Sequence, residues 1–138
     1  MYKKRIVVIC PGRGSYTRET NGYLKTNEAK TKDNIELLSW YHKKNINDYK
    51  TILFLHGNAG TLENRIYKIN YFKDIDVNFL LLSWRGFSGN NGDPSEKGIY
   101  EDARSAVRWL KNKGIVEKNI IIYGESLGTG AAVEIAQN

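Results

Sequence analysis

The sequence predicts an α/β fold with a mostly parallel sheet flanked by helices. Three apolar runs point to this fold, at residues 51–55, 77–83 and 119–123. Each run is continuous rather than alternating, which is typical of parallel strands covered on both faces. A helical segment follows each run, and this alternation indicates a parallel sheet with right-handed crossovers. With 138 residues, the chain forms one domain at most.

The amino-terminal third is less regular. Residues 5–10 predict a short buried strand that holds Cys10, followed by a glycine-containing turn. Residues 15–34 are polar, show little periodicity and predict a loop or linker. Residues 35–40 predict a further strand, so the regular alternation begins only at this point.

The remaining elements carry local boundary signals. After the run at 51–55 we expect a glycine-rich turn and a helix over roughly 61–73. Ser95 is suited to the N-cap of the next helix, and Gly114 to its C-cap. Between them, one apolar helix face is formed by Ile99, Ala103, Ala106, Val107 and Leu110. The run at 119–123 is followed by a helix that starts near Leu127.

Composition and charge exclude several classes. The net charge of +6 is scattered, with neither a long basic run nor interleaved aromatic residues, so we expect no nucleic-acid partner. Cys10 is the only cysteine, which rules out an intrachain disulfide. The apolar runs are too short for a signal peptide or a membrane span. We therefore expect a cytoplasmic protein that needs no metal or cofactor.

The stretch Gly124-Glu125-Ser126-Leu127-Gly128 matches the G-x-S-x-G pattern of a nucleophile elbow. In such an elbow the serine occupies a strained corner between a strand and a helix, and small residues on either side let the chain pack around it. The helix that begins at Leu127 would direct its backbone N–H groups toward the reaction centre. Ser126 is thus the predicted catalytic nucleophile.

A second glycine-rich turn, "HGNAG" at 56–60, follows the strand at 51–55. Such a turn can present a backbone N–H to a developing oxyanion, and we predict that the N–H groups of Asn58 and Leu127 form this oxyanion hole. His56 belongs to the turn itself, so we expect a packed, hydrogen-bonded histidine rather than a general base. His42 is expected to be exposed.

With these motifs in place, residues 34–138 resemble the amino-terminal part of an α/β-hydrolase-fold serine hydrolase of the depalmitoylase-like and monoacylglycerol-lipase-like subgroup. The resemblance implies Ser126 as nucleophile, Asn58 and Leu127 as oxyanion hole, and a structural role for Arg85 and Gly86. It also implies a small-molecule acyl ester or thioester substrate. The motifs that carry it are "TKDNIELLSWYHKK" (31–44), "ILFLHGNAG" (52–60), "LLSWRGFSGNNGDPSEKGIYEDARSAVRWL" (81–110) and "IIIYGESLGTGAAVEIA" (120–136).

Residues 1–24 do not fit this family and weakly resemble the start of a malonyl-CoA:acyl-carrier-protein transacylase, through "VVICPGRGSY". We therefore divide the chain into an atypical amino-terminal segment, 1–30, made of a strand and a polar loop, and a truncated α/β-hydrolase domain, 31–138.

The family pattern is incomplete in this chain. In the family the triad acid and the histidine follow the serine, yet after Ser126 there is no histidine and Glu134 is the only carboxylate side chain. Because an unassisted serine hydroxyl is a weak nucleophile, we expect little or no turnover. We also expect the strand at 119–123 to form an exposed apolar edge.

Two further interpretations remain open at this level. The G-x-S-x-G serine and residues 6–15 would also suit an acyltransferase-like protein. Alternatively, the chain is a non-enzymatic remnant or interaction module that associates through an exposed sheet edge.

Overall fold

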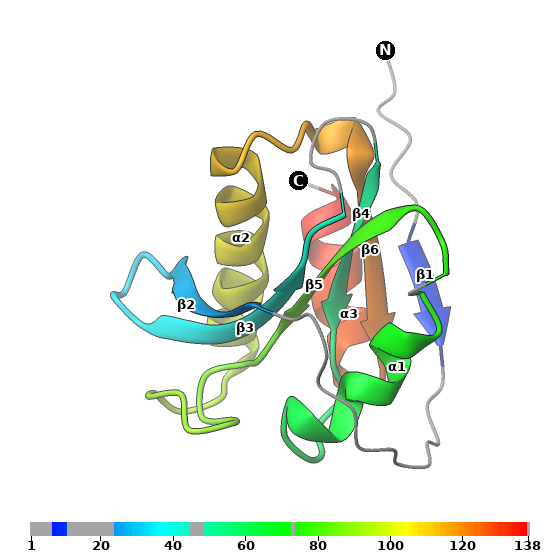
Figure 1. Ribbon diagram of the computed structural model, residues 1–138. Helices are drawn as coiled ribbons and strands as arrows, with labels where there is room; N and C mark the ends of the chain where they lie inside the picture. The colour runs from blue at the N-terminus through cyan, green and yellow to red at the C-terminus, as the bar shows by residue number, and fades with distance from the viewer. Residues whose placement is uncertain (1–6, 11–23, 45–48, 73, 138) are drawn as a thin grey trace.

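A computed structural model of the chain describes residues 7–10, 24–44, 49–72 and 74–137 (Figure 1). The strands form one six-stranded sheet in the order β1-β6-β4-β5-β3-β2. They are β1 (Val7–Cys10), β2 (Leu24–Lys30), β3 (Glu36–His42), β4 (Lys50–Leu55), β5 (Val77–Leu82) and β6 (Ile120–Glu125).

Most of the sheet is parallel, as the sequence predicted. β1, β6, β4 and β5 are parallel neighbours, whereas β3 runs antiparallel to β5 and β2 antiparallel to β3. The continuous apolar runs account for the centre of the sheet, because every residue after the first in β4 and in β5 is buried. The fold is therefore an α/β fold with its helices packed on a mixed, mainly parallel sheet.

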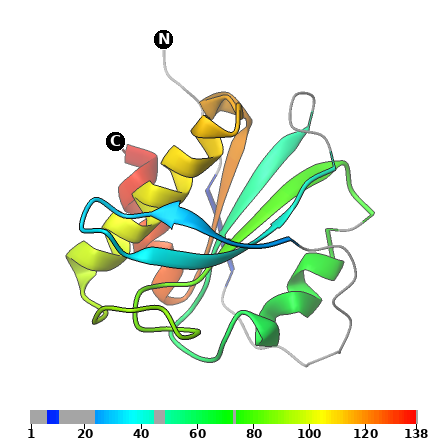
Figure 2. The same cartoon turned by 60° about the vertical axis from the view of Figure 1, so that its left-hand side comes forward.

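The helices cover both faces of the sheet (Figures 1 and 2). α2 (Glu96–Asn112) and α3 (Leu127–Gln137) lie on one face, and α1 (Ile66–Asn70) lies on the other. Two short 3₁₀ helices complete the set, η1 (Glu63–Arg65) directly before α1 and η2 (Glu117–Asn119) directly before β6. Within the described ranges, no helix is both long and apolar enough to cross a membrane.

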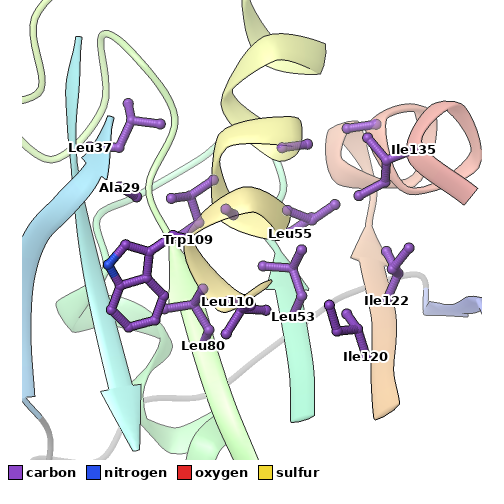
Figure 3. Packing of buried hydrophobic residues seen from close by; sticks show 14 of the residues in the cluster. Ala29, Leu37, Leu53, Leu55, Leu80, Trp109, Leu110, Ile120, Ile122 and Ile135 are labelled. Carbon is purple, nitrogen blue, oxygen red and sulfur yellow. The ribbon is translucent and has the colours of Figure 1, made fainter. Parts of the chain in front are cut away.

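Each face has its own hydrophobic core. Under α2 and α3, side chains from β4, β5 and β6 pack against Trp109, Leu110 and Ile135 (Figure 3). Under α1, Ile66 and Ile69 pack on Phe54 and Phe79 of β4 and β5. Alternate side chains of a strand point to opposite faces, so the central strands contribute side chains to both cores.

Local signals set the ends of α2 as predicted. The Ser95 side chain accepts a hydrogen bond from the Gly98 N–H and caps the first turn. At the other end Gly114 has a φ of 89°, and the Ile115 N–H bonds the Leu110 carbonyl while the Gly114 N–H bonds the Lys111 carbonyl. This pair of bonds is the Schellman termination, which satisfies carbonyls left open at a helix end.

Two expectations were wrong in part. The loop predicted for 15–34 contains strand β2, where buried Ala29 lies between exposed Glu28 and Lys30. The helix expected over 61–73 is shorter, since 63–70 is helical and the other described residues of this range are not. An edge strand needs few apolar side chains, and β2 pairs through its backbone, so hydrophobic patterning gave no signal for it.

The exposed edge expected at 119–123 is absent from the described sheet, because β1 pairs in parallel with β6. Val7 pairs with Ile122 and Cys10 with Glu125. The strand predicted at 5–10 is thus confirmed over Val7–Cys10, and it covers the strand that leads to Ser126. The rest of the "VVICPGRGSY" stretch and the side chain of Cys10 lie outside the described residues. Both β1 and β2 belong to the same sheet as the remainder of the chain.

Candidate active site

The segments that follow β4 and β6 meet at one edge of the sheet. The two strands are parallel neighbours, and Leu55 pairs with Gly124 near their carboxyl ends. Binding sites of open α/β sheets form at this edge, where the loops after the strands come together. The loop at 56–60 therefore lies beside the corner at Ser126.

Ser126 occupies the corner itself. β6 ends at Glu125 and α3 begins at Leu127, so the chain passes from strand to helix within one residue. The φ of Ser126 is 50°, in the left-handed region that costs a residue with a side chain about 1–2 kcal/mol. Ser126 is exposed to solvent. Strain of this kind collects at functional sites, and the corner has the form predicted for a nucleophile elbow.

Glycines allow this corner to pack tightly. A Cβ on Gly128 would lie 2.0 Å from the Leu55 carbonyl oxygen. A Cβ on Gly124 would lie 2.6 Å from the Gly128 carbonyl oxygen and 2.8 Å from the Cβ of Ala132. No side chain fits at such distances, so the structure confirms that small residues are needed on both sides of the serine.

A hollow of about 240 Å³ adjoins Ser126. It is lined by Gly57, Asn58, Ala59, Gly60, Asn64, Arg65, Tyr67, Lys68, Glu125 and Ser126. Gly57 lies close to Ser126, because a Cβ built on it would lie 3.1 Å from the Cβ of Ser126. The structure thus brings Asn58 and Ser126, both singled out from the sequence, to the same hollow.

Leu127 is the first residue of α3, directly after Ser126. The first N–H groups of a helix have no intrahelical acceptor and carry the positive end of the helix dipole. The Asn58 N–H donates to no acceptor within the described part of the chain. Two backbone donors therefore flank the serine corner.

His56 is fully buried and hydrogen-bonded, as expected for a turn histidine. Its Nε2 accepts from the Trp84 N–H at 3.3 Å, so its Nδ1 carries the proton and donates to the Gly57 carbonyl oxygen at 2.6 Å. Burial, with a smaller contribution from the nearby Arg65 charge, lowers the pKa of His56 to about 3. Because His56 is neutral and both of its ring nitrogens are already hydrogen-bonded, it is not available as a general base for Ser126.

Arg65, at the end of η1, also binds this loop. Its guanidinium donates to the carbonyl oxygens of Thr61 at 2.8 Å and Gly57 at 3.3 Å, and also to that of Ala59. The side chain is buried, with 7% of the residue exposed. One arginine therefore binds three carbonyls of the loop that contains Asn58.

The carboxylates near the site are engaged elsewhere. Glu125, directly before the serine, forms an ion pair with Lys68 of α1, and both side chains are mostly buried. Glu134, the only carboxylate side chain after Ser126, forms an ion pair with Arg104 of α2. Neither arrangement places a carboxylate behind a histidine, as a catalytic triad requires.

Arg85 has the structural role that was expected of it. Its guanidinium binds Asp33 at 2.7 Å and Asp102 at 2.8 Å, and its backbone N–H donates to the Asp102 carboxylate. Burial opposes the charged form of Arg85, but the two carboxylates outweigh it and raise the pKa of the guanidinium. The same contact lowers the pKa of Asp33 well below its usual value.

Sequence reasoning missed three residues of this site, namely Arg65, Lys68 and Glu125. All three line the hollow beside Ser126. Arg65 and Lys68 lie on η1 and α1, three residues apart, and face the site because of how the chain turns after β4. Their spacing alone would have shown that they share a helix face, but not what that face contacts.

Several known proteins are similar in sequence to this chain, although no protein-family model matches it. Over 112 residues it is 34% identical to lysophosphatidylserine lipase ABHD12 of Danio rerio. Over 94 residues it is 34% identical to the α/β hydrolase domain-containing protein aho-3 of Caenorhabditis elegans. These alignments cover 80% and 65% of this chain, and 28% of each relative.

Solved structures of α/β hydrolases are also similar to this chain. An α/β hydrolase from Vibrio vulnificus is 35% identical with a TM-score of 0.62, over 78% of this chain and 36% of that chain. The chain has the α/β-hydrolase fold and is related in sequence to proteins of that family. The esterase Pf2001 of Pyrococcus furiosus, 21% identical with a TM-score of 0.63 over 89% of this chain, has the same fold. The alignment covers 51% of that esterase, so the chain spans about half, or less, of the length of each relative named here.

Proposed function

We propose that the chain carries the nucleophile half of a serine-hydrolase site for ester, thioester or lipid acyl bonds. The observation that carries this proposal is the corner at Ser126. A non-glycine residue with a φ of 50° stands between a strand and a helix, held by two glycines that nothing larger can replace. The names of the relatives, a lipase and an esterase among them, support acyl-ester substrates.

In this proposal the Ser126 Oγ attacks the carbonyl carbon of the acyl bond. The new C–O bond converts the carbonyl oxygen into an oxyanion, which accepts hydrogen bonds from the backbone N–H groups of Asn58 and Leu127. Collapse of this intermediate breaks the bond to the leaving group and leaves an acyl-enzyme, which water then hydrolyses. The hydroxyl proton must first pass to a base.

That base is the part we do not assign to any residue of this chain. His56 is neutral and occupied, and His42, which was expected to be exposed, lies half-buried at the end of β3. Glu134 is paired with Arg104. We therefore propose that the 138-residue polypeptide by itself is inactive or turns over very slowly.

Phosphorylation by paraoxon, with imidazole added as an external base, tests the assignment. Oγ attacks phosphorus, p-nitrophenolate leaves with the electrons of the broken P–O bond, and imidazole takes the hydroxyl proton. We expect a mass increase of one diethylphosphoryl group that depends on imidazole and disappears in Ser126→Ala.

The alternatives give distinct results. Equal labelling of the Ser126→Ala variant would overturn Ser126 as the nucleophile. Rapid labelling of Ser126 without imidazole would overturn the proposed inactivity and show that a base is already in place.

A further inference from the structure

The Gly57–Asn58 peptide is held from its carbonyl side by two side chains. His56 Nδ1–H donates to the Gly57 oxygen at 2.6 Å, and Arg65 Nη2 donates to the same oxygen at 3.3 Å. This carbonyl belongs to the same peptide unit as the Asn58 N–H. The inference below rests on the proposed function, in which that N–H binds the oxyanion.

A trans peptide couples its two ends. The unit is planar, so its C=O and N–H point in opposite directions and one cannot turn without the other. No cis peptide occurs in the described chain. Donors that fix the Gly57 oxygen therefore also fix the direction of the Asn58 N–H.

Arg65 binds more than the Gly57 carbonyl. It also binds the carbonyls of Ala59 and Thr61, on the far side of Asn58. Its planar fork presents several N–H groups at fixed angles, which a lysine ammonium cannot reproduce. The loop is thereby fixed on both sides of the residue whose N–H is required.

We propose that Arg65, with His56, is a positioning residue that aims the Asn58 N–H at the oxyanion formed on Ser126. The hydrogen bonds on the Gly57 oxygen also polarise the peptide and strengthen its N–H as a donor. Gly57 lies directly beside Ser126, with a built Cβ 3.1 Å from the serine Cβ. A small shift of the loop therefore changes the distance between donor and oxyanion directly.

Arg65→Met and Arg65→Lys test this role in the full chain. With paraoxon and imidazole, we expect the rate of Ser126 phosphorylation to fall at least about tenfold in Arg65→Met, since loss of one oxyanion donor costs about 10²–10³-fold. The rate should also fall in Arg65→Lys, because lysine keeps the positive charge but lacks the planar guanidinium that binds several carbonyls at once. Arg104→Met, on α2 and paired with Glu134, is the matched control and should label like the unmodified chain.

A comparison of paraoxon with parathion separates positioning from a general structural effect. Sulfur is a poor hydrogen-bond acceptor, so a working oxyanion hole favours the P=O compound over the P=S compound. We expect this preference to shrink in both Arg65 variants and to persist in Arg104→Met. An unchanged preference and rate in folded Arg65 variants would overturn the proposal. If Arg65→Met does not fold, Arg65→Lys decides in the same way.

The direction of the Asn58 N–H gives a readout that does not depend on reactivity. The residual dipolar coupling of the Asn58 backbone amide should change in the Arg65 variants. It should remain unchanged in Arg104→Met. If the unmodified chain never labels at Ser126, the proposed function fails. A changed Asn58 coupling would still show that Arg65 holds this peptide, whereas an unchanged one would overturn the positioning role.

Discussion

The loops that follow β4 and β5 are both rich in glycine and both held by a buried arginine, but the two arginines bind different partners. Arg65 binds three neutral backbone carbonyls of a single loop. Arg85 binds two carboxylates, Asp33 and Asp102, that are distant in sequence. The first arginine therefore sets the shape of one loop, whereas the second ties separate elements of the fold together.

The two loops are also joined to each other. The Trp84 N–H and indole N–H bind His56 through its Nε2 and its carbonyl oxygen, and the Leu62 N–H donates to the Ser88 Oγ at 3.1 Å. Hydrogen bonds from the loop after β5 thus help to hold the loop after β4. After β5 the arginine binds two carboxylates, whereas after β4 the arginine binds backbone carbonyls beside the hollow that adjoins Ser126.

The largest effect should come from Arg85→Met. This change leaves the carboxylate of Asp102, which is fully buried, without its ionic partner. Breaking a buried pair on one side costs about 3–5 kcal/mol, so the free energy of unfolding in urea should fall by that amount. Arg65→Met should cost less, because it leaves neutral carbonyl oxygens rather than a charged carboxylate without a partner.

Arg104→Met serves as the control for Arg85→Met. Its ion pair with Glu134 is more than a quarter exposed on each side, and such pairs contribute at most about 1 kcal/mol. If Arg85→Met destabilised the protein no more than Arg104→Met, the contrast between the two loops would be wrong.

A smaller effect is expected from the protonation of His56. The folded protein keeps this ring neutral down to a pKa of about 3, while the unfolded chain protonates it near 6.5. Because the unfolded state binds the extra proton, stability should fall as the pH decreases from 6.5 toward 3. At pH 5 this contribution is about 2 kcal/mol relative to pH 7, measured by urea unfolding at both values.

The pKa of His42 serves as an internal comparison for the pKa of His56. Partial burial and the nearby Lys44 also lower the pKa of His42, but by less. In a ring-proton NMR titration, His42 should titrate first and His56 only near pH 3. Titration of His56 close to pH 6.5 would show that its bonds to Gly57 and Trp84 are not held in solution.

The parts of this structure that the sequence predicted are local ones. Continuous apolar runs gave β4, β5 and β6, and capping residues gave the ends of α2. The elbow was predictable because the strand, the serine and the two glycines are adjacent in the sequence.

The parts that were missed depend on pairing between distant residues. β1 covers β6 across more than 100 positions, and β2 is a polar edge strand without an apolar pattern. Asp33, Arg85 and Asp102 meet only because β3, β5 and α2 pack together. The hydrogen bonds of Arg65 to the loop after β4 likewise depend on the path of the chain after that strand.

A crystal structure of the chain phosphorylated by paraoxon in the presence of imidazole tests the central claim most directly. We predict diethylphosphoryl on the Ser126 Oγ, with the phosphoryl oxygen about 2.7–3.1 Å from the backbone nitrogens of both Asn58 and Leu127. A phosphoryl group on another residue, or one on Ser126 whose oxygen binds neither nitrogen, would contradict the account.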